Sequence, residues 1–340
     1  MEIAALFARQ AQACTEMGSP FTGRVLRLVV PLLDPATPLG QRVLTFPATP
    51  DDALPLRLAG ALHALARSGA ALAAVYPPHS ASDTALAAGL RTALETEATA
   101  LLPWIDSAPQ TNEVARSAVL IAAGHWLTAR FGLPLVLSEL GASAGLNLLW
   151  DHYGLALPGS LYGPPDPVLS FAPVWTGALP VAVRPVIADR AGVDLSPLDP
   201  ARDRDRMLAY IWADQTLRLD RAKAALTLAA RIRPGVAQGD AADWAETRLQ
   251  TPFPGRIHLL YHTVASQYFP DPIRDRIAAA LQTAGARATP TAPLAHFAME
   301  GDGKTGSAVL TLTAWPGGAS LAVGRADFHG RWVVWHPPVA

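Results

Sequence analysis

The spacing of hydrophobic residues divides the chain into two regions. Over about the first 110 residues, apolar positions recur at helical intervals, most clearly in 2–17 and 56–75. The segment 25–33 is apolar except for Arg27 and fits a helix or a strand equally well. Prolines separate the predicted helices, and they stand at Pro77, Pro78, Pro103 and Pro109. The pattern predicts an N-terminal helical region over residues 1–110.

From residue 111 onward, predicted helices alternate with short apolar runs typical of buried strands. This alternation predicts an α/β domain over 111–340, a doubly wound, mostly parallel, Rossmann-like sheet. Pro316-Gly317-Gly318 divides 307–328 into two alternating strands, which predicts a C-terminal antiparallel hairpin at the sheet edge. Residues 154–185 are rich in Pro and Gly, and we expect a long irregular insertion there. The predicted strands are 133–140, one ending near Asp194, one that starts the strand-and-turn segment 235–241, 256–263 and 293–299, and the predicted helices are 111–131, 201–232 and 271–286.

Composition excludes several classes of protein. The 340 residues are 50% hydrophobic and 16% charged, which excludes a disordered chain and a charge-rich coiled coil. The 27 basic and 28 acidic residues argue against an extended nucleic-acid surface. The single cysteine, Cys14, excludes an internal disulfide and a cysteine-based zinc site. With no long apolar run and no basic leader, we expect a cytoplasmic protein with a small-molecule partner and no membrane or metal. The oligomeric state is not indicated.

The main chemical signal is the segment 139–147, ELGASAGLN, at the end of a predicted strand. Small residues allow a ligand to approach the backbone, and a helix predicted after Gly145 would offer free N–H groups. An acid at the strand end can accept hydrogen bonds from hydroxyl or ammonium groups. With Glu139, Gly141 and Gly145 in place and Ser143 where a glycine is usual, the segment resembles motif I of class I S-adenosylmethionine (SAM) methyltransferases. The alternative is a tight turn without a ligand.

The resemblance extends to two later strand ends. It implies that Asp194 accepts hydrogen bonds from the ribose hydroxyls, and that Asp240 and Ala241 lie at the adenine. Asn147 completes the cofactor-binding set by its place in the first motif. Ligands of open α/β sheets bind at the carboxyl ends of the strands, where all these residues are predicted to lie. The expected cofactor is therefore SAM.

Two further groups of residues are candidates for the acceptor side. The predicted strand 256–263 ends near His262, and Tyr268 follows it; either side chain could orient or deprotonate an acceptor. A His262 hydrogen-bonded inside the fold is the simpler alternative. Three residues one turn apart, Asn112, Glu113 and Arg116, are candidates for lining the substrate pocket.

Residues 141–145 also spell G-x-S-x-G, the nucleophile elbow of α/β-hydrolases. Ser143 would then be the nucleophile, with Asp240 and either His262 or His329 completing a triad. The helical start of the chain and its final hairpin argue against that fold. A protein that binds a nucleotide-like ligand without turnover is the third hypothesis.

The whole chain resembles a bacterial family catalogued only as a domain of unknown function. The resemblance covers most of the chain and rests on GSPFTGRVL (18–26), TNEVARS (111–117), ELGASAGLNLLWDHY (139–153), GVDLSPLD (192–199), IWADQTLR (211–218) and YHTVASQYF (261–269). It implies no activity. Residues 212–218, within the fifth motif, are interpreted as part of a surface helix, with pocket lining as the alternative.

Overall fold

The computed structural model describes residues 2–47, 49, 52–69 and 71–338, and they form two compact units. The first comprises residues 1–111 and 202–223, and the second comprises 112–201 and 224–340. Residues 202–223, which the sequence analysis placed in the second domain, thus belong to the helical unit. The long helix α9 (Thr216–Ile232) runs from the first unit into the second.

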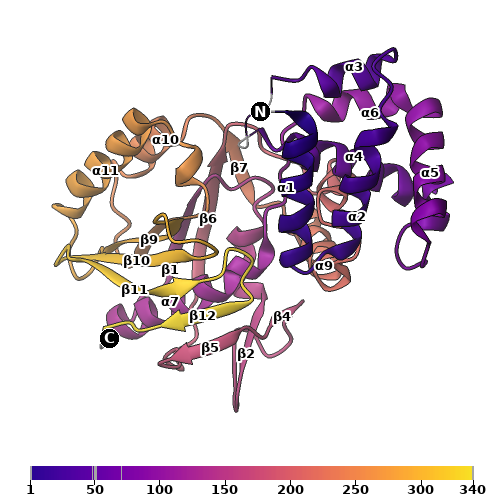
Figure 1. Ribbon diagram of the computed structural model, residues 1–340. Helices are drawn as coiled ribbons and strands as arrows, with labels where there is room; N and C mark the ends of the chain where they lie inside the picture. The colour runs from indigo at the N-terminus through magenta and orange to yellow at the C-terminus, as the bar shows by residue number, and fades with distance from the viewer. Residues whose placement is uncertain (1, 48, 50–51, 70, 339–340) are drawn as a thin grey trace. The chain divides into compact units, whose positions relative to one another are not determined.

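Among the residues described, the regular structure of the first unit is entirely helical (Figure 1). Leu26, Leu58 and Leu62 are fully buried in its core, as the helical spacing predicts. The ambiguous segment 25–33 is helical, because it continues α2 and ends in a short 3-10 turn. The helices are α1 (Ile3–Glu16), α2 (Pro20–Val29), α3 (Pro38–Leu44), α4 (Leu54–Arg67), α5 (Asp83–Thr96), α6 (Ala98–Ile105) and α8 (Arg204–Ala209), with 3-10 turns η1 (Val30–Leu32) and η3 (Ala71–Val75).

Hydrogen bonds of Asp214 connect two of the family motifs, 211–218 and 18–26. Its carboxylate accepts hydrogen bonds from the Ser19 hydroxyl and from the backbone N–H of Phe21, at the start of α2. The chain between α8 and α9 holds Asp214 and is not helical, so the predicted helix is absent at 212–215, and only 216–218 are helical, as the start of α9. Asp214 instead satisfies one of the N–H groups that a helix start leaves without partners.

The second unit is built on a nine-stranded sheet in the order β5-β12-β11-β10-β9-β8-β1-β6-β7. The pairs from β9 to β7 are all parallel, whereas β9, β10, β11 and β12 pair antiparallel. The predicted strands and final hairpin are confirmed, but the hairpin is not the edge, because β12 and β5 extend the sheet beyond it. The strands are β1 (Leu135–Leu140), β5 (Val174–Gly177), β6 (Ile187–Asp194), β7 (Gly235–Gln238), β8 (Ile257–Thr263), β9 (Leu294–Gly301), β10 (Ala308–Trp315), β11 (Ser320–Ala326) and β12 (Trp332–Trp335).

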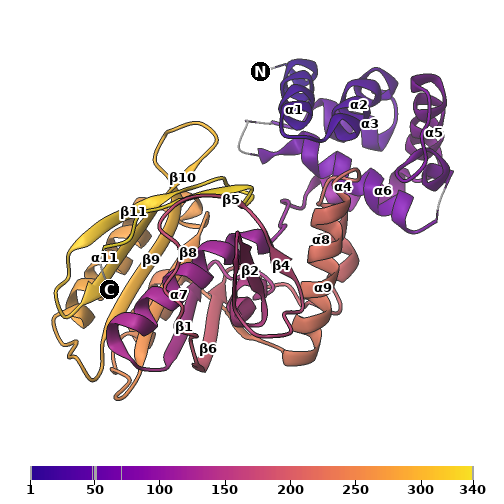
Figure 2. The same cartoon turned by 90° about the horizontal axis from the view of Figure 1, so that it is seen from below.

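Helices cover the two faces of the parallel part of this sheet (Figure 2). Leu140 and Leu260 point to the face covered by α10 (Ala241–Arg248) and α11 (Asp271–Gly285). The other face carries α7 (Ser117–Phe131), whose Gly124 leaves no room for a side chain because the Trp150 ring lies against it. As predicted, α7 ends at residue 131, and Gly132 follows it in the left-handed conformation. The start differs from the prediction, because a 3-10 turn η4 (Val114–Arg116) comes first and Glu113 caps it.

The insertion at 154–185 is more regular than expected. It contains β5 and a small three-stranded sheet in the order β3-β2-β4, built from β2 (Gly154–Leu157), β3 (Ser160–Tyr162) and β4 (Ser170–Phe171). These strands are too short for the periodicity of the sequence to reveal. The insertion therefore replaces the helix that usually connects neighbouring parallel strands, here β1 and β6.

Candidate functional site

The candidate residues gather at the carboxyl edge of the parallel strands. Glu139 lies next to the end of β1, Asp194 ends β6, and Asp240 follows β7. After β1 the chain continues to β6 on one side, whereas β8 lies on the other side of β1. Such a reversal of strand order opens a crevice where ligands of doubly wound sheets bind. The structure thus brings the three predicted strand ends to one edge.

The turn 141–145 is held in an unusual backbone conformation. Gly141 and Gly145 have φ angles of 68° and 70°, and Ser143 has a φ of 53°, which is uncommon for a residue with a side chain. The N–H groups of Gly141 and Ala142 both donate to the carbonyl of Val193 on β6. A Cβ atom added at Gly141 would lie 2.7 Å from the Cβ of Ala265. The glycine therefore serves both the turn and the close packing of the chain after β8.

The segment after Gly145 is not the predicted α-helix. It is a seven-residue 3-10 helix, η5 (Leu146–His152), with a kink at Leu149. Its first N–H group, that of Leu146, donates to the side-chain oxygen of Asn112 at 3.0 Å. The expected anion-binding helix terminus is therefore absent, because η5 is short and Asn112 occupies its leading donor.

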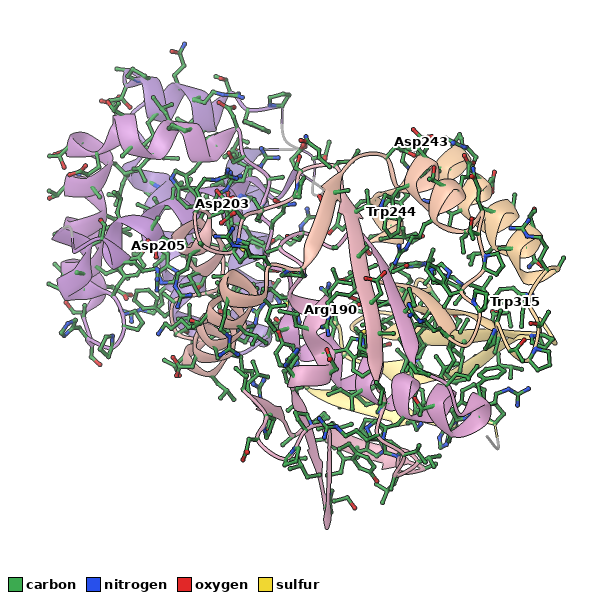
Figure 3. The ribbon with its side chains drawn as sticks, turned by 180° about the vertical axis from the view of Figure 1, so that it is seen from behind. Arg190, Asp203, Asp205, Asp243, Trp244 and Trp315 are labelled. Carbon is green, nitrogen blue, oxygen red and sulfur yellow. The ribbon has the colours of Figure 1, made fainter. Side chains whose placement is uncertain are left out.

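Side chains from the sheet and from the residue after η5 donate hydrogen bonds to the carbonyls of η5, which explains why η5 stays short. The hydroxyl of Tyr153 donates to the carbonyl of Leu146, and the hydroxyl of Tyr261 donates to that of Asn147. Arg190 on β6 donates to the carbonyl of Leu148 at 2.7 Å and forms a bidentate ion pair with Asp151 (Figure 3). Side chains thus use carbonyls that would otherwise extend the helix.

Glu139 is the most unusual side chain at this edge. It is only 2% exposed, and it makes no hydrogen bond to any described residue; its Oε2 atom is fully buried. Burial, and then the nearby Asp194 carboxylate, raise the pKa of Glu139 well above its ordinary value, although Arg116 opposes this. The hydroxyl of Ser143 is likewise buried without a partner. Buried polar atoms are normally satisfied, so two such atoms at one turn are exceptions to that rule.

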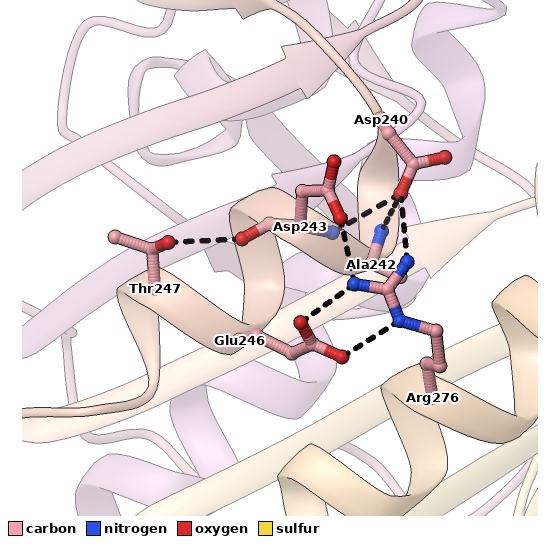
Figure 4. A network of polar contacts seen from close by, with 6 residues as sticks. All are labelled: Asp240, Ala242, Asp243, Glu246, Thr247 and Arg276. Carbon is pink, nitrogen blue, oxygen red and sulfur yellow. Dashed lines mark hydrogen bonds and ion pairs between the residues drawn. The ribbon is translucent and has the colours of Figure 1, made fainter.

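Asp194 and Asp240 both have structural partners. Asp194 accepts hydrogen bonds from the N–H groups of Ser143 and Ser196, at 2.8 and 2.9 Å. Asp240 is the N-cap of α10, where its Oδ1 atom accepts from Ala242 and Asp243. Figure 4 shows that this cap belongs to an ion-pair network in which Arg276 of α11 joins Asp243, Glu246 and, at 4.0 Å, Asp240 itself. A carboxylate has about four acceptor positions, so each Asp retains capacity for a ligand. Ala241 is buried at the first turn of α10.

The other predicted binding residues brace the turn from the side of α7. Asn147 is fully buried; its side chain accepts from the Ser117 hydroxyl at 2.7 Å and donates to the carbonyl of Glu113 at 3.2 Å. Arg116 donates to the carbonyls of Thr263 and Phe328. These contacts connect the start of α7 with η5 and with the end of β8.

His262 and Tyr268 are in very different environments. Tyr268 is 75% exposed. His262 is buried, and both of its ring nitrogens are engaged, Nδ1 with Glu300 at 2.6 Å and Nε2 with Nε2 of His296 at 3.2 Å. Burial alone would raise the pKa of Glu300, but the bond and charge of His262 and the backbone donors of Ala265 and Ser266 bring it below its ordinary value. Sequence reasoning missed Glu300, and alternation along 293–301 is the only signal that places it with His296.

A serine-hydrolase triad is not assembled around Ser143. Its positive φ resembles the strained turn of a nucleophile elbow. However, no described histidine lies within hydrogen-bonding distance of its hydroxyl, and activation of a serine requires an adjacent base. Over the described residues, no group of three or more metal-binding side chains is present either.

Comparison with known families adds one finding. A family model described as "uncharacterized protein conserved in bacteria" (DUF2332) matches residues 4–335. The chain belongs to this family. No curated protein and no solved structure matches it. Among the described residues, no helix is both long and apolar enough to cross a membrane.

Proposed function

We propose that this member of the DUF2332 family is a SAM-dependent methyltransferase acting on a small molecule. The observation that carries the proposal is the buried Glu139 carboxyl at the end of β1, with an oxygen that has no partner. An unsatisfied buried carboxyl costs free energy, and a ligand with ammonium or hydroxyl groups would recover it. The amino-acid and ribose parts of SAM carry both kinds of donor.

The order of the parallel strands supports the same reading. In chain order they lie as third, second, first, fourth and fifth, which is the arrangement of Rossmann-type nucleotide-binding sheets. Glu139, Asp194 and Asp240 lie at the ends of, or directly after, the first, second and third of these strands. This is where the methyltransferase resemblance requires carboxylates.

The charge of the site favours SAM over phosphorylated nucleotides. Dinucleotide-binding sheets place a pyrophosphate at a free helix N-terminus. Here the corresponding N–H, that of Leu146, is bonded to Asn112, and the Asp194 carboxylate lies at the turn, bonded to the N–H of Ser143. Negative phosphates would be repelled at this position, whereas a cationic, phosphate-free nucleoside would be attracted.

The residues present would hold SAM in the following way. Glu139 would accept from its ammonium group, Asp194 from the ribose hydroxyls, and Asp240 from the adenine amino group near Ala241. The cofactor would supply an electrophilic methyl group to an acceptor. Asn112, Glu113 and Arg116 are proposed to line the acceptor side, and His262 or Tyr268 to orient the acceptor. If His262 orients the acceptor, it would have to give up its hydrogen bond to His296.

A thermal-shift experiment tests the proposal against its alternatives. SAM and its demethylated product should raise the melting temperature, whereas NAD and ATP at the same concentration should not. At ~100 times the dissociation constant, the expected stabilisation is about 2.7 kcal/mol. Labelling of Ser143 by a fluorophosphonate, lost in Ser143→Ala, would instead establish the hydrolase alternative. Stabilisation by SAM without turnover of any acceptor would indicate a binding protein.

A further inference from the structure

A cluster of three titratable side chains lies at the end of β8 and β9, outside the proposed ligand contacts of the turn. His262 on β8 pairs in register with Ala298 on β9. His296 and Glu300 lie two residues to either side of Ala298, so both share a sheet face with His262. Oε1 of Glu300 lies 2.6 Å from Nδ1 of His262, whose Nε2 lies 3.2 Å from Nε2 of His296.

The same oxygen of Glu300 also holds the backbone after β8. The N–H groups of Ala265 and Ser266 donate to Oε1 at 3.0 and 3.1 Å. They directly follow Val264, which has a φ of 54° although it is β-branched. That conformation is strained for valine and persists only where the surroundings impose it. Glu300 therefore accepts two backbone hydrogen bonds next to this strained residue, and the same carboxylate is hydrogen-bonded to His262.

The turn that Glu300 holds packs directly on the candidate ligand turn. The Cβ of Ala265 lies where a side chain at Gly141 would have to be, only 2.7 Å from such an atom. The ring of Phe269, at the other end of the same segment, contacts His262. Movement of Ala265 would therefore change the space that Gly141 occupies. Arg116 and Arg274 also contact this segment, but they bind its carbonyl oxygens and not its N–H groups.

We propose that Glu300 is a positioning residue for the candidate site. Through one carboxylate oxygen it fixes the 264–266 turn, and through Ala265 it sets the conformation of the Gly141–Gly145 turn without contacting the ligand. His262 then serves to orient Glu300, a role different from direct contact with an acceptor. The consequence for ligand affinity rests on the proposed function, whereas the coupling of the two turns does not.

Amide hydrogen exchange on the full-length protein tests the coupling. Glu300→Met preserves the approximate volume but removes both oxygens, and Glu300→Gln keeps an acceptor. In Glu300→Met, exchange should accelerate about tenfold at Ala265 and Ser266, which is the loss of roughly one net hydrogen bond each. It should also accelerate at Gly141, Ala142 and Gly145, whereas Glu300→Gln should stay near the wild type. Unchanged protection of the central β1 and β8 amides would show that the fold is retained.

Asp302→Asn is the matched control, because Asp302 is an acid two residues further on that pairs with Arg325. It should leave exchange in both turns unchanged. If Glu300→Met accelerates exchange at Ala265 and Ser266 but leaves 141–145 as in the wild type, the proposed coupling is wrong. If exchange at neither turn changes, or Asp302→Asn has the same effect as Glu300→Met, the positioning role of Glu300 is wrong.

A titration with SAM separates the positioning role of Glu300 from the proposed function. Where the wild type binds SAM, Glu300→Met should weaken binding about tenfold and Glu300→Gln should restore most of it. If the wild type does not bind SAM, the proposed function fails, while the exchange result still decides the role of Glu300. Unchanged affinity in Glu300→Met, in a wild type that binds, would overturn the positioning role in ligand binding.

Discussion

The carboxylate of Asp194 accepts a hydrogen bond from the backbone N–H of Ser143 at a distance of 2.8 Å. The end of β6 thereby holds the strained residue of the turn that follows β1. Asp194 is thus part of the turn, in addition to being the residue proposed to bind ribose. A substitution at this position should therefore affect both the stability of the second unit and its ligand affinity.

We predict that Asp194→Ala lowers the unfolding free energy of the second unit by about 2–4 kcal/mol, because two charge-assisted backbone hydrogen bonds are lost. Affinity for SAM should fall at least about tenfold. Chemical denaturation and calorimetric titration measure the two effects. Asp189→Ala is the control, since Asp189 lies on the same strand as Asp194 and forms a partly exposed ion pair with Arg248 of α10. It should cost less than about 1 kcal/mol and leave binding unchanged. The reverse pattern would contradict this assignment of Asp194.

Ligand binding should be coupled to release of a proton from Glu139. Its raised pKa keeps Glu139 protonated in the free protein at pH values below that pKa, and an ammonium group favours the ionised form. Affinity should therefore rise with pH, by up to about tenfold per unit, until the pH passes the raised pKa. Calorimetry in two buffers of different ionisation enthalpy measures the released proton. Glu139→Gln should release none; equal release from that variant would assign the proton to another group.

Acid should destabilise the second unit through His258. Burial lowers the pKa of His258 to about 3, with smaller effects from Arg248 and, in the opposite direction, Asp189. The unfolded chain binds a proton near pH 6.5 and the folded protein does not, so stability falls as pH drops below that value. At pH 5 the loss is about 2 kcal/mol from this residue. His258→Gln should be less stable at pH 7 but should flatten the profile between pH 7 and 5. A slope equal to that of the wild type would argue against a neutral, buried His258.

Gly192 on β6 should not tolerate a side chain. A Cβ atom there would lie 2.6 Å from the Cβ of Ala142 and 3.1 Å from a methyl carbon of Leu148. Gly192→Ala should therefore displace the turn or η5 and destabilise the protein by about 1–3 kcal/mol. Gly235→Ala, on the neighbouring strand β7 with open space around it, is the matched control. Denaturation midpoints that are equal for the two variants would contradict the close packing of the turn on β6.

The sequence predicted the strands well where a continuous apolar run is buried on both faces, as in β1 and β8. It failed at 146–152, where apolar spacing resembles an α-helix but tyrosine hydroxyls and Arg190 hold the carbonyls. The strands of the insertion, of two to four residues, are too short to show a period.

The site was predictable only in part, for a related reason. Small residues and acids at strand ends mark Glu139, Ser143 and Asp194 along the chain. Asp194 accepts from the N–H of Ser143, Asn112 from that of Leu146, and Glu300 from that of Ala265. Each of these hydrogen bonds joins segments that are far apart in the sequence. Only the fold brings such residues together, and local patterns carry no signal for them.

Calorimetric titration of the full-length protein with SAM is the most direct measurement of the central claim. We expect one SAM bound per chain, an affinity that increases with pH, and at least about a tenfold loss of affinity in Glu139→Gln. ADP and NAD, which carry phosphates, should not bind at the same concentrations. No binding of SAM at millimolar concentration, or binding that Glu139→Gln leaves unchanged, would show that the proposed SAM site is wrong.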